Sequence, residues 1–185
     1  MNEEVKVNID KADLFTIIQF GSKEDFIKKL QLENKSIENI KNLCDNNKVS
    51  LLSKCLAFRK FEIAKMLLTT GTAINVVSNQ GLNELHYLVS NIHEVGAIAI
   101  GNILLEKGVD INLADKKYGN TPLWYLCLEA TRSNSEELYA FIEKCLYLKP
   151  EIDKLNSSGI SIRIMIEKGD FKFLSKLIKK VSEQK

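Results

Sequence analysis

The sequence predicts an all-α fold in which about five helix-turn-helix units stack into a solenoid with projecting polar β-turns. Two observations carry this prediction. Short polar turns recur along the chain, and the apolar residues between them fall at helical spacing. With 185 residues, 45% of them apolar, the chain has the size of one domain and enough apolar material for a core.

The recurring turns set the period. They begin at Asp45, Ser78, Asp115 and Asn156, so successive turns start 33, 37 and 41 residues apart. The increase indicates insertions into a period of about 33 residues rather than a different period.

The segments between the turns repeat as well. Residues 61–75 and 97–112 each contain an apolar stretch ending in Leu-Leu, then two polar residues, a glycine and Ile-Asn. Gly71 and Gly108 stand where a helix must end in the left-handed conformation, which glycine adopts without penalty. Each is therefore expected to end a helix.

The helices also have recognisable starts. Thr121 can offer its hydroxyl to the free amides of a first turn, and Pro122 suits the first helical position because no amide is needed there. Ser50 and Asn83 precede the equivalent apolar stretches, and both residue types are good caps. The helix starts thus keep the same capping chemistry although the capping residues differ.

These features resemble the ankyrin repeat family. The resemblance rests on Gly-Asn-Thr-Pro-Leu at 119–123, Glu-Leu-His at 84–86 and the two Gly-x-x-Ile-Asn helix ends. It implies one solenoid domain over residues 1–185. The implied units are approximately 12–44, 45–77, 78–114, 115–155 and 156–182, of which the first and last cap the stack.

The chain departs from the family pattern at two places. The helix-start histidine, which in the family helps to tie adjacent repeats, is present only as His86, and Trp124 stands in its place in the next unit. Because an indole has a donor and no acceptor, we expect Trp124 either to fill space between repeats or to open part of its face to a partner. Lys149-Pro150 replaces a helix-ending glycine, so we expect a reshaped junction there.

Charge and motifs argue against several function classes. The 26 Lys and Arg nearly balance 24 Asp and Glu, and the sequence contains no phosphate loop, dinucleotide fingerprint, nucleophile elbow or zinc H-E-x-x-H motif. The N-terminus lacks a signal pattern, and the richest apolar stretch is about half the ~20 residues of a membrane helix. We expect a non-catalytic cytoplasmic protein, monomeric when free, with no cofactor, metal, nucleic-acid or membrane partner.

The cysteines are widely separated and form no C-x-x-C pair. They lie among helical apolar residues, which favours buried, reduced thiols over zinc ligands or disulfides. The four residues are Cys44, Cys55, Cys127 and Cys145.

The resemblance implies that the turns and first helices form a partner-binding face. The expected contact residues are Asn46, Asn47, Asn79, Gln80, Lys116, Lys117 and Tyr118 at the turn tips, with Phe58, Asn91 and Glu129 at helix ends. Tyr118 and Trp124 are the expected anchors, because aromatic residues dominate binding energy at protein interfaces. The two lysines beside Tyr118 favour an acidic patch on the partner.

Two insertions distinguish the chain from a regular repeat. They lie at residues 90–98 and 129–137, and either they are tolerated lengthenings or they contact the partner.

The composition suggests one kind of partner. Abundant Asn, Lys and Ile resemble proteins of AT-rich genomes, including many bacteria, in which small free-standing ankyrin proteins are similar to immunity proteins that neutralise a toxin. We expect the chain to bind and inhibit one specific partner protein. The alternative is a general adaptor, or a host-directed interaction protein with a signalling partner.

Leucine-to-alanine changes test the expected core. Leu67, Leu68, Leu104 and Leu105 are each expected to lose about 2–5 kcal/mol of unfolding free energy, because the change removes buried methyl groups and leaves a cavity. Urea unfolding measures the loss, with Gln80→Ala at a turn tip as the control. Equal losses in core and tip variants would contradict the assignment.

Overall fold

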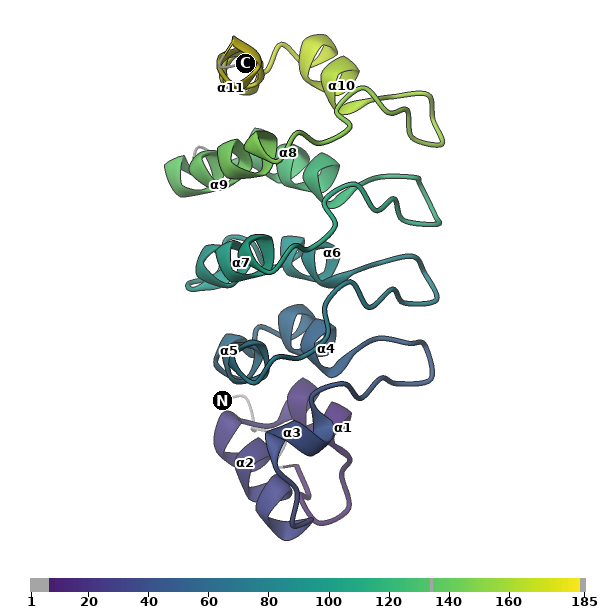
Figure 1. The fold of residues 1–185 in the computed structure, drawn as a ribbon, viewed down its shortest axis with the longest axis vertical. Helices are drawn as coiled ribbons and strands as arrows, with labels where there is room; N and C mark the ends of the chain where they lie inside the picture. The colour runs from purple at the N-terminus through teal and green to yellow at the C-terminus, as the bar shows by residue number, and fades with distance from the viewer. Residues whose placement is uncertain (1–6, 134, 184–185) are drawn as a thin grey trace, which may run out of the picture.

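The chain folds into pairs of helices that stack in a column (Figure 1). The computed structural model describes residues 7–133 and 135–183. Over these residues the regular structure is α-helical, which confirms the all-α prediction, and an isolated antiparallel bridge joins Cys44 and Ser50. The helices are α1 (Leu14–Phe20), α2 (Lys23–Leu32), α3 (Ile37–Ile40), α4 (Leu51–Ala57), α5 (Phe61–Thr69), α6 (Glu84–Val89), α7 (Ala97–Glu106), α8 (Pro122–Arg132), α9 (Glu136–Tyr147), α10 (Ile162–Lys168) and α11 (Lys172–Glu183).

The helices form two columns with the turns projecting along one edge (Figure 1). In one column α1 packs on α4, α4 on α6 and α6 on α8, and in the other α5 packs on α7, α7 on α9 and α9 on α11. Each pair therefore buries its apolar residues against the pairs before and after it. Across residues 7–133 and 135–183, no helix is both long and apolar enough to span a membrane.

The local signals for helix ends are confirmed. The hydroxyls of Ser50 and Thr121 and the side chain of Asn83 accept the expected amide of the first turn, and Pro122 begins α8. Gly71 and Gly108 adopt φ of 77° and 79°, as a left-handed helix end requires.

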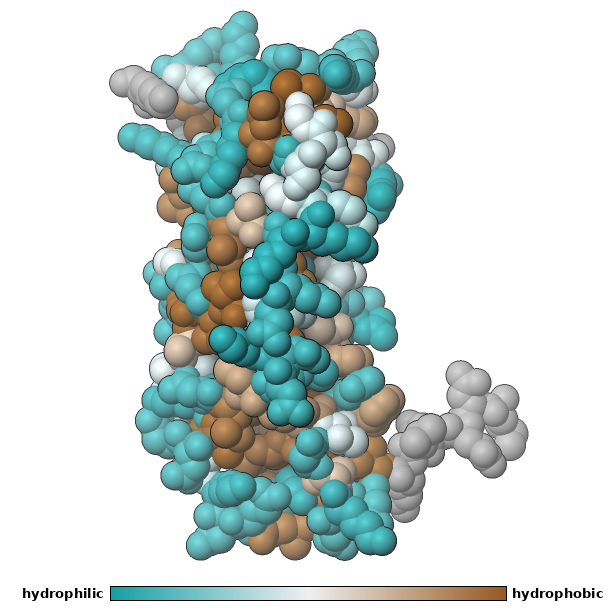
Figure 2. Space-filling model, turned by 90° about the vertical axis from the view of Figure 1, so that its right-hand side faces the viewer, coloured by the Kyte–Doolittle hydropathy of each residue, from teal (hydrophilic) through white to brown (hydrophobic). Residues whose placement is uncertain are grey.

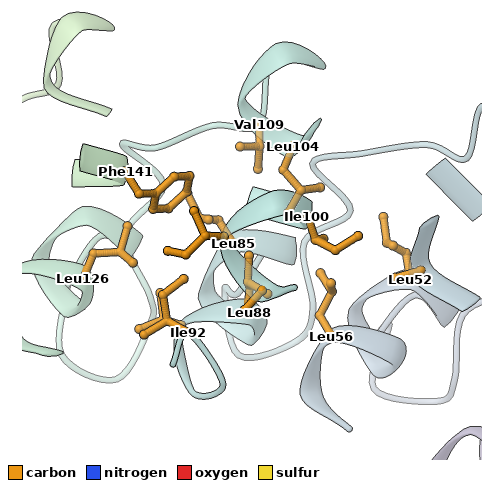
Figure 3. Close-up of a cluster of buried hydrophobic side chains, with 14 of the residues drawn as sticks. Leu52, Leu56, Leu85, Leu88, Ile92, Ile100, Leu104, Val109, Leu126 and Phe141 are labelled. Atoms are coloured by element: carbon orange, nitrogen blue, oxygen red, sulfur yellow. The ribbon is translucent and has the colours of Figure 1, made fainter. Parts of the chain in front are cut away.

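A continuous apolar core runs through the stack (Figure 3). Leu67, Leu68 and Leu104 are buried as expected, but Leu105 is only half-buried, so the expected loss for Leu105→Ala is smaller than for the other three. Leu105 is one residue further round α7 than Leu104, and it packs against the edge of the core rather than inside it.

One cysteine prediction is wrong. Cys55, Cys127 and Cys145 are buried, and all four thiols are free, but Cys44 is exposed. Cys44 lies directly before a turn, where the chain runs along the edge of the stack rather than inside a helix. Burial raises the pKa of Cys145 to about 12, and it raises the pKa of Cys55 and Cys127 as well.

The two insertions have different structures. The second lengthens α8 to 11 residues, compared with 7 in α4, and α9 begins at Glu136 after the cap Ser135. Asn134, inside this insertion, lies outside the described residues. The first forms a loop after α6 that ends at Gly96 with φ of 89°.

The last helix pair joins the stack mainly through α9 and α11. Lys149, in the position of the missing glycine, adopts φ of 56°, an unfavourable conformation for a residue with a side chain. A cavity of about 590 Å³ opens beside it, lined in part by Ile152, Arg163 and Ile178. Through Lys149, α9 ends in the same left-handed conformation as the helices before Gly71 and Gly108. The difference at this junction is that Pro150 has no amide to replace the bonds that Thr72 and Val109 donate at the earlier ones.

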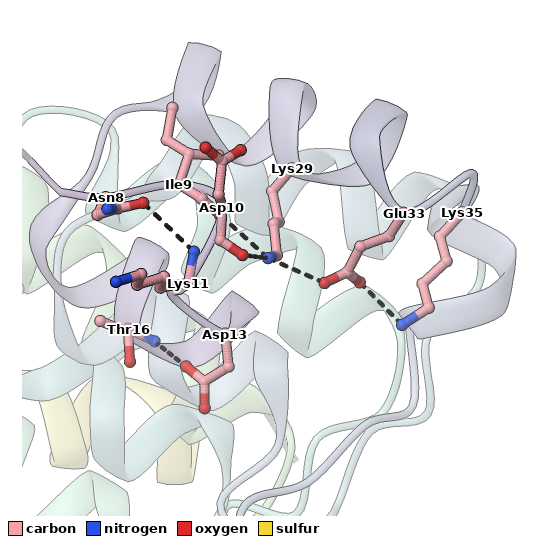
Figure 4. A network of polar contacts seen from close by, with 9 residues as sticks. All are labelled: Asn8, Ile9, Asp10, Lys11, Asp13, Thr16, Lys29, Glu33 and Lys35. Atoms are coloured by element: carbon pink, nitrogen blue, oxygen red, sulfur yellow. Dashed lines mark hydrogen bonds and ion pairs between the residues drawn. The ribbon is translucent and has the colours of Figure 1, made fainter.

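A buried lysine fastens the N-terminal segment to the first helix pair (Figure 4). Lys29 is 6% exposed, and its Nζ donates to the main-chain oxygens of Ile9 at 3.0 Å and Asp10 at 3.2 Å. The same Nζ lies 3.1 Å from a carboxylate oxygen of Glu33, which also pairs with Lys35 at 2.8 Å. Its charge is thus compensated where its stem is buried.

Lys29→Met keeps the aliphatic stem and removes these bonds. We expect a loss of about 1–3 kcal/mol of unfolding free energy. We also expect faster hydrogen exchange at the Ala12 amide, which donates to Asn8 at 2.9 Å within the fastened segment. Lys28→Met, at an exposed position on the same helix, is the control. Unchanged exchange at Ala12 in the Lys29 variant would contradict this role.

Candidate protein-binding surface

The first residue of each turn organises that turn from within. The Asp45 carboxylate accepts the amides of Asn47 at 2.8 Å and Val49 at 3.0 Å, and the side chains of Ser78, Asp115 and Asn156 accept turn amides in the same way. Burial alone would raise the pKa of Asp115, but hydrogen bonds from its turn amides and the Tyr125 hydroxyl outweigh burial and lower that pKa. The turn backbones are therefore held in one conformation.

Main-chain hydrogen bonds join each turn to the one before it. In each, an amide at the start of one turn donates to a carbonyl near the tip of the preceding turn. The pairs are Asn79 to Asn47 at 2.9 Å, Lys116 to Gln80 at 3.0 Å and Ser157 to Tyr118 at 2.8 Å. The four turns are thus fixed in register.

A row of asparagines forms a second set of links behind the turns. Each side-chain oxygen accepts a main-chain amide of the following helix pair's end segment. The pairs are Asn42 with Ala73 at 2.8 Å, Asn75 with Asp110 at 2.6 Å and Asn112 with Glu151 at 2.9 Å. Neighbouring units are therefore connected both at the turns and behind them.

Two buried ionisable groups lie where these links meet α6. His86 Nδ1 accepts the Asn83 amide at 3.3 Å, and its Nε2 lies 3.3 Å from the Asn120 carbonyl oxygen in the next turn. Burial lowers the pKa of His86. Glu84 accepts the Asn75 amide at 2.9 Å, and burial raises its pKa despite this bond. His86 therefore contacts the following unit, as the sequence suggested.

The predicted turn residues lie together in a row. Asn46, Asn47, Asn79, Gln80, Lys116, Lys117 and Tyr118 are all exposed. Figure 2 looks onto this edge and shows a hydrophilic band along the middle of the molecule. Tyr118 is 49% exposed, and Lys117 Nζ lies 4.7 Å from the centre of its ring. The phenol and its neighbouring cation are therefore accessible to a partner.

The predicted helix-end residues lie elsewhere and already have partners. Phe58 and Asn91 follow α4 and α6, at the ends of these helices away from the turns. Lys54 Nζ lies 5.4 Å from the centre of the Phe58 ring, and the Asn91 amide group donates to the carbonyls of the last two residues of α4, both at 2.9 Å. Glu129, in α8, accepts from Arg132 at 2.7 Å. Each of these three side chains therefore lies apart from the turns and already has a partner within the fold.

Trp124 is half-buried, so it fills space beside the core while part of its surface stays open. It packs against the core and meets Tyr125 edge to face, with ring centres 5.7 Å apart. Its Nε1 is buried and has no hydrogen-bond partner among the described residues, so it does not reproduce the contact that His86 makes. Sequence reasoning missed Tyr125, whose hydroxyl donates to Asp115 at 2.9 Å and braces the turn from α8. The feature of the sequence that could have identified Tyr125 is its position four residues after the Thr121 cap.

No protein-family model matches the sequence, and no curated protein matches it. Within the described residues, no three His, Cys, Asp or Glu side chains lie close enough together to hold a metal ion.

The burial of His86 predicts a pH dependence of stability. Because the folded state lowers the pKa of His86, its neutral form favours folding, so this stability is complete above the ordinary value of 6.5 and is lost as pH falls below it. His86→Gln keeps a donor and an acceptor but does not titrate. Urea unfolding between pH 7.5 and pH 5 is expected to show a steeper loss in the original chain than in the variant. Identical slopes would contradict the assignment.

Proposed function

We propose that the chain is a non-catalytic, cytoplasmic ankyrin-repeat protein that binds and inhibits one partner protein through its row of turns. The observation that carries the proposal is the in-register stack of turns with exposed side chains. Their main-chain groups are largely paired within and between turns. The tips therefore bind without first having to order themselves, which lowers the entropy cost of association.

The composition of the row supports a protein partner. Exposed amides at Asn46, Asn79 and Gln80 can donate and accept, and Tyr118 offers a large apolar area with little side-chain freedom to lose. Trp124, in the first turn of α8, keeps part of its indole open and offers a further aromatic surface. Inhibition follows because a chain of this kind acts by occupying a surface of its partner. An immunity protein against a toxin is the form of inhibition proposed.

A tagged pull-down from the native cell, read by mass spectrometry, tests the proposal. The test variant is Lys117→Glu/Tyr118→Ala. The matched control is Lys176→Glu/Phe173→Ala on α11, where Lys176 is exposed and Phe173 is 51% exposed. We expect one stoichiometric partner that the control retains and the turn variant loses by at least about tenfold, because an aromatic anchor and its neighbouring charge are removed.

Other results separate the alternatives. Many substoichiometric partners would indicate an adaptor instead of an inhibitor. A stoichiometric partner that the turn variant retains would show that the recognition face is placed wrongly. Toxicity of the isolated partner, relieved by this chain, would distinguish an immunity protein from other inhibitors.

A further inference from the structure

The outward charge of the turns has one sign. Lys48, Lys116 and Lys117 are exposed, and none of them forms an ion pair in the part of the chain that the structure describes. The two turn carboxylates do not offset them outwardly, because Asp45 and Asp115 face their own turn amides. The turns therefore present unpaired positive charge although the whole chain is nearly neutral.

An apolar row runs beside these lysines. The residue directly before each turn is apolar or weakly polar, and we call these four residues the pre-turn row: Cys44, Val77, Ala114 and Leu155. Val77 is 40% exposed, Leu155 is 57% exposed, and Cys44 is exposed. Because the turns are bonded in register, the four positions follow one another along the stack. Figure 2 shows apolar surface beside the hydrophilic band.

We propose that the turns and the pre-turn row together recognise an extended acidic segment of the partner protein, in which acidic and apolar residues alternate. This inference rests on the proposed function and specifies the partner's chemistry. Alternate side chains of a strand point to opposite sides. A strand lying between the two rows thus directs carboxylates towards Lys48, Lys116 and Lys117 and apolar side chains towards Val77 and Leu155.

The dimensions of the stack fit such a segment. Helices packed in layers lie ~8–10 Å apart, so four successive turns span roughly 30 Å. An extended chain rises about 3.3 Å per residue, so roughly nine or ten residues cover this length. The side-chain amides of Asn46 and Gln80 are exposed along the way and can bond to the main chain of the segment.

A nucleic acid fits the surface less well. Duplex DNA carries one charge per ~1.7 Å, whereas the turns offer three lysines over the whole row. The exposed Val77 and Leu155 side chains have no counterpart on a phosphate backbone. Charge complementarity combined with the apolar row therefore favours a protein segment.

Selection from a phage-displayed library of random twelve-residue peptides tests the proposal, with the full chain as bait. The charge-reversed bait is Lys116→Glu/Lys117→Glu. The matched control is Lys65→Glu/Lys176→Glu, which makes the same charge change at exposed positions on α5 and α11. We expect the original chain and the control to enrich peptides with alternating acidic and apolar residues. The reversed bait is expected to bind these peptides at least about tenfold more weakly and to enrich basic ones.

A second variant isolates the apolar row. Val77→Ser/Leu155→Ser is expected to weaken binding of the selected peptides severalfold at constant salt. The preference for acidic peptides is expected to remain. Three results would each overturn the proposal. They are selection without acidic enrichment, equal binding of the peptides to the charge-reversed bait, and tighter binding of a twenty-nucleotide thymidine oligomer than of any selected peptide. If the pull-down partner is lost in the turn variant but no acidic peptide is selected, the proposed function stands and this inference fails.

Discussion

Within residues 7–133 and 135–183, no helix pair buries its apolar residues alone, and the contact between neighbouring pairs is the constraint on which the rest of the structure depends. Leu85 and Leu104 are fully buried only because adjacent helix pairs cover them. In such a stack, stability is approximately a sum of units and nearest-neighbour interfaces. The main-chain bonds between turns and the asparagine links behind them convert this packing into a fixed register. The position of every turn side chain follows from that register.

The same hydrogen bonds decide what the turns can offer to a partner. The Asp45 and Asp115 carboxylates, which would otherwise project as negative charge, are directed at turn amides. The side chains of Lys117 and Tyr118 remain exposed because they neither accept a turn amide nor pack against a helix. A surface that is polar, positively charged and already rigid therefore results from the way the turns are closed. Because the tip side chains do not close the turns, they can be replaced without loss of the fold.

Local chemistry made much of this structure predictable. Thr121, Pro122 and Gly108 act within a few residues of themselves, so their caps and helix ends were read directly from the sequence. Features set by distant residues were not. The side chain of Asn91 donates to carbonyls 34 and 35 residues earlier. Its amide is therefore not a free group for the predicted contact with a partner. Of the candidate site, the tips were predicted from the family resemblance, whereas the pre-turn row required the register seen in the structure.

Site-specific photo-crosslinking in the native cell tests most directly whether the row of turns is the surface that meets a partner. A photoreactive amino acid would replace Gln80 or Tyr118 at the tips and, separately, Lys65 or Lys176 away from them, all four being exposed positions. We expect both tip positions to crosslink to the same protein and neither distant position to do so. Crosslinks to that protein from Lys65 or Lys176, with none from the tips, would contradict it.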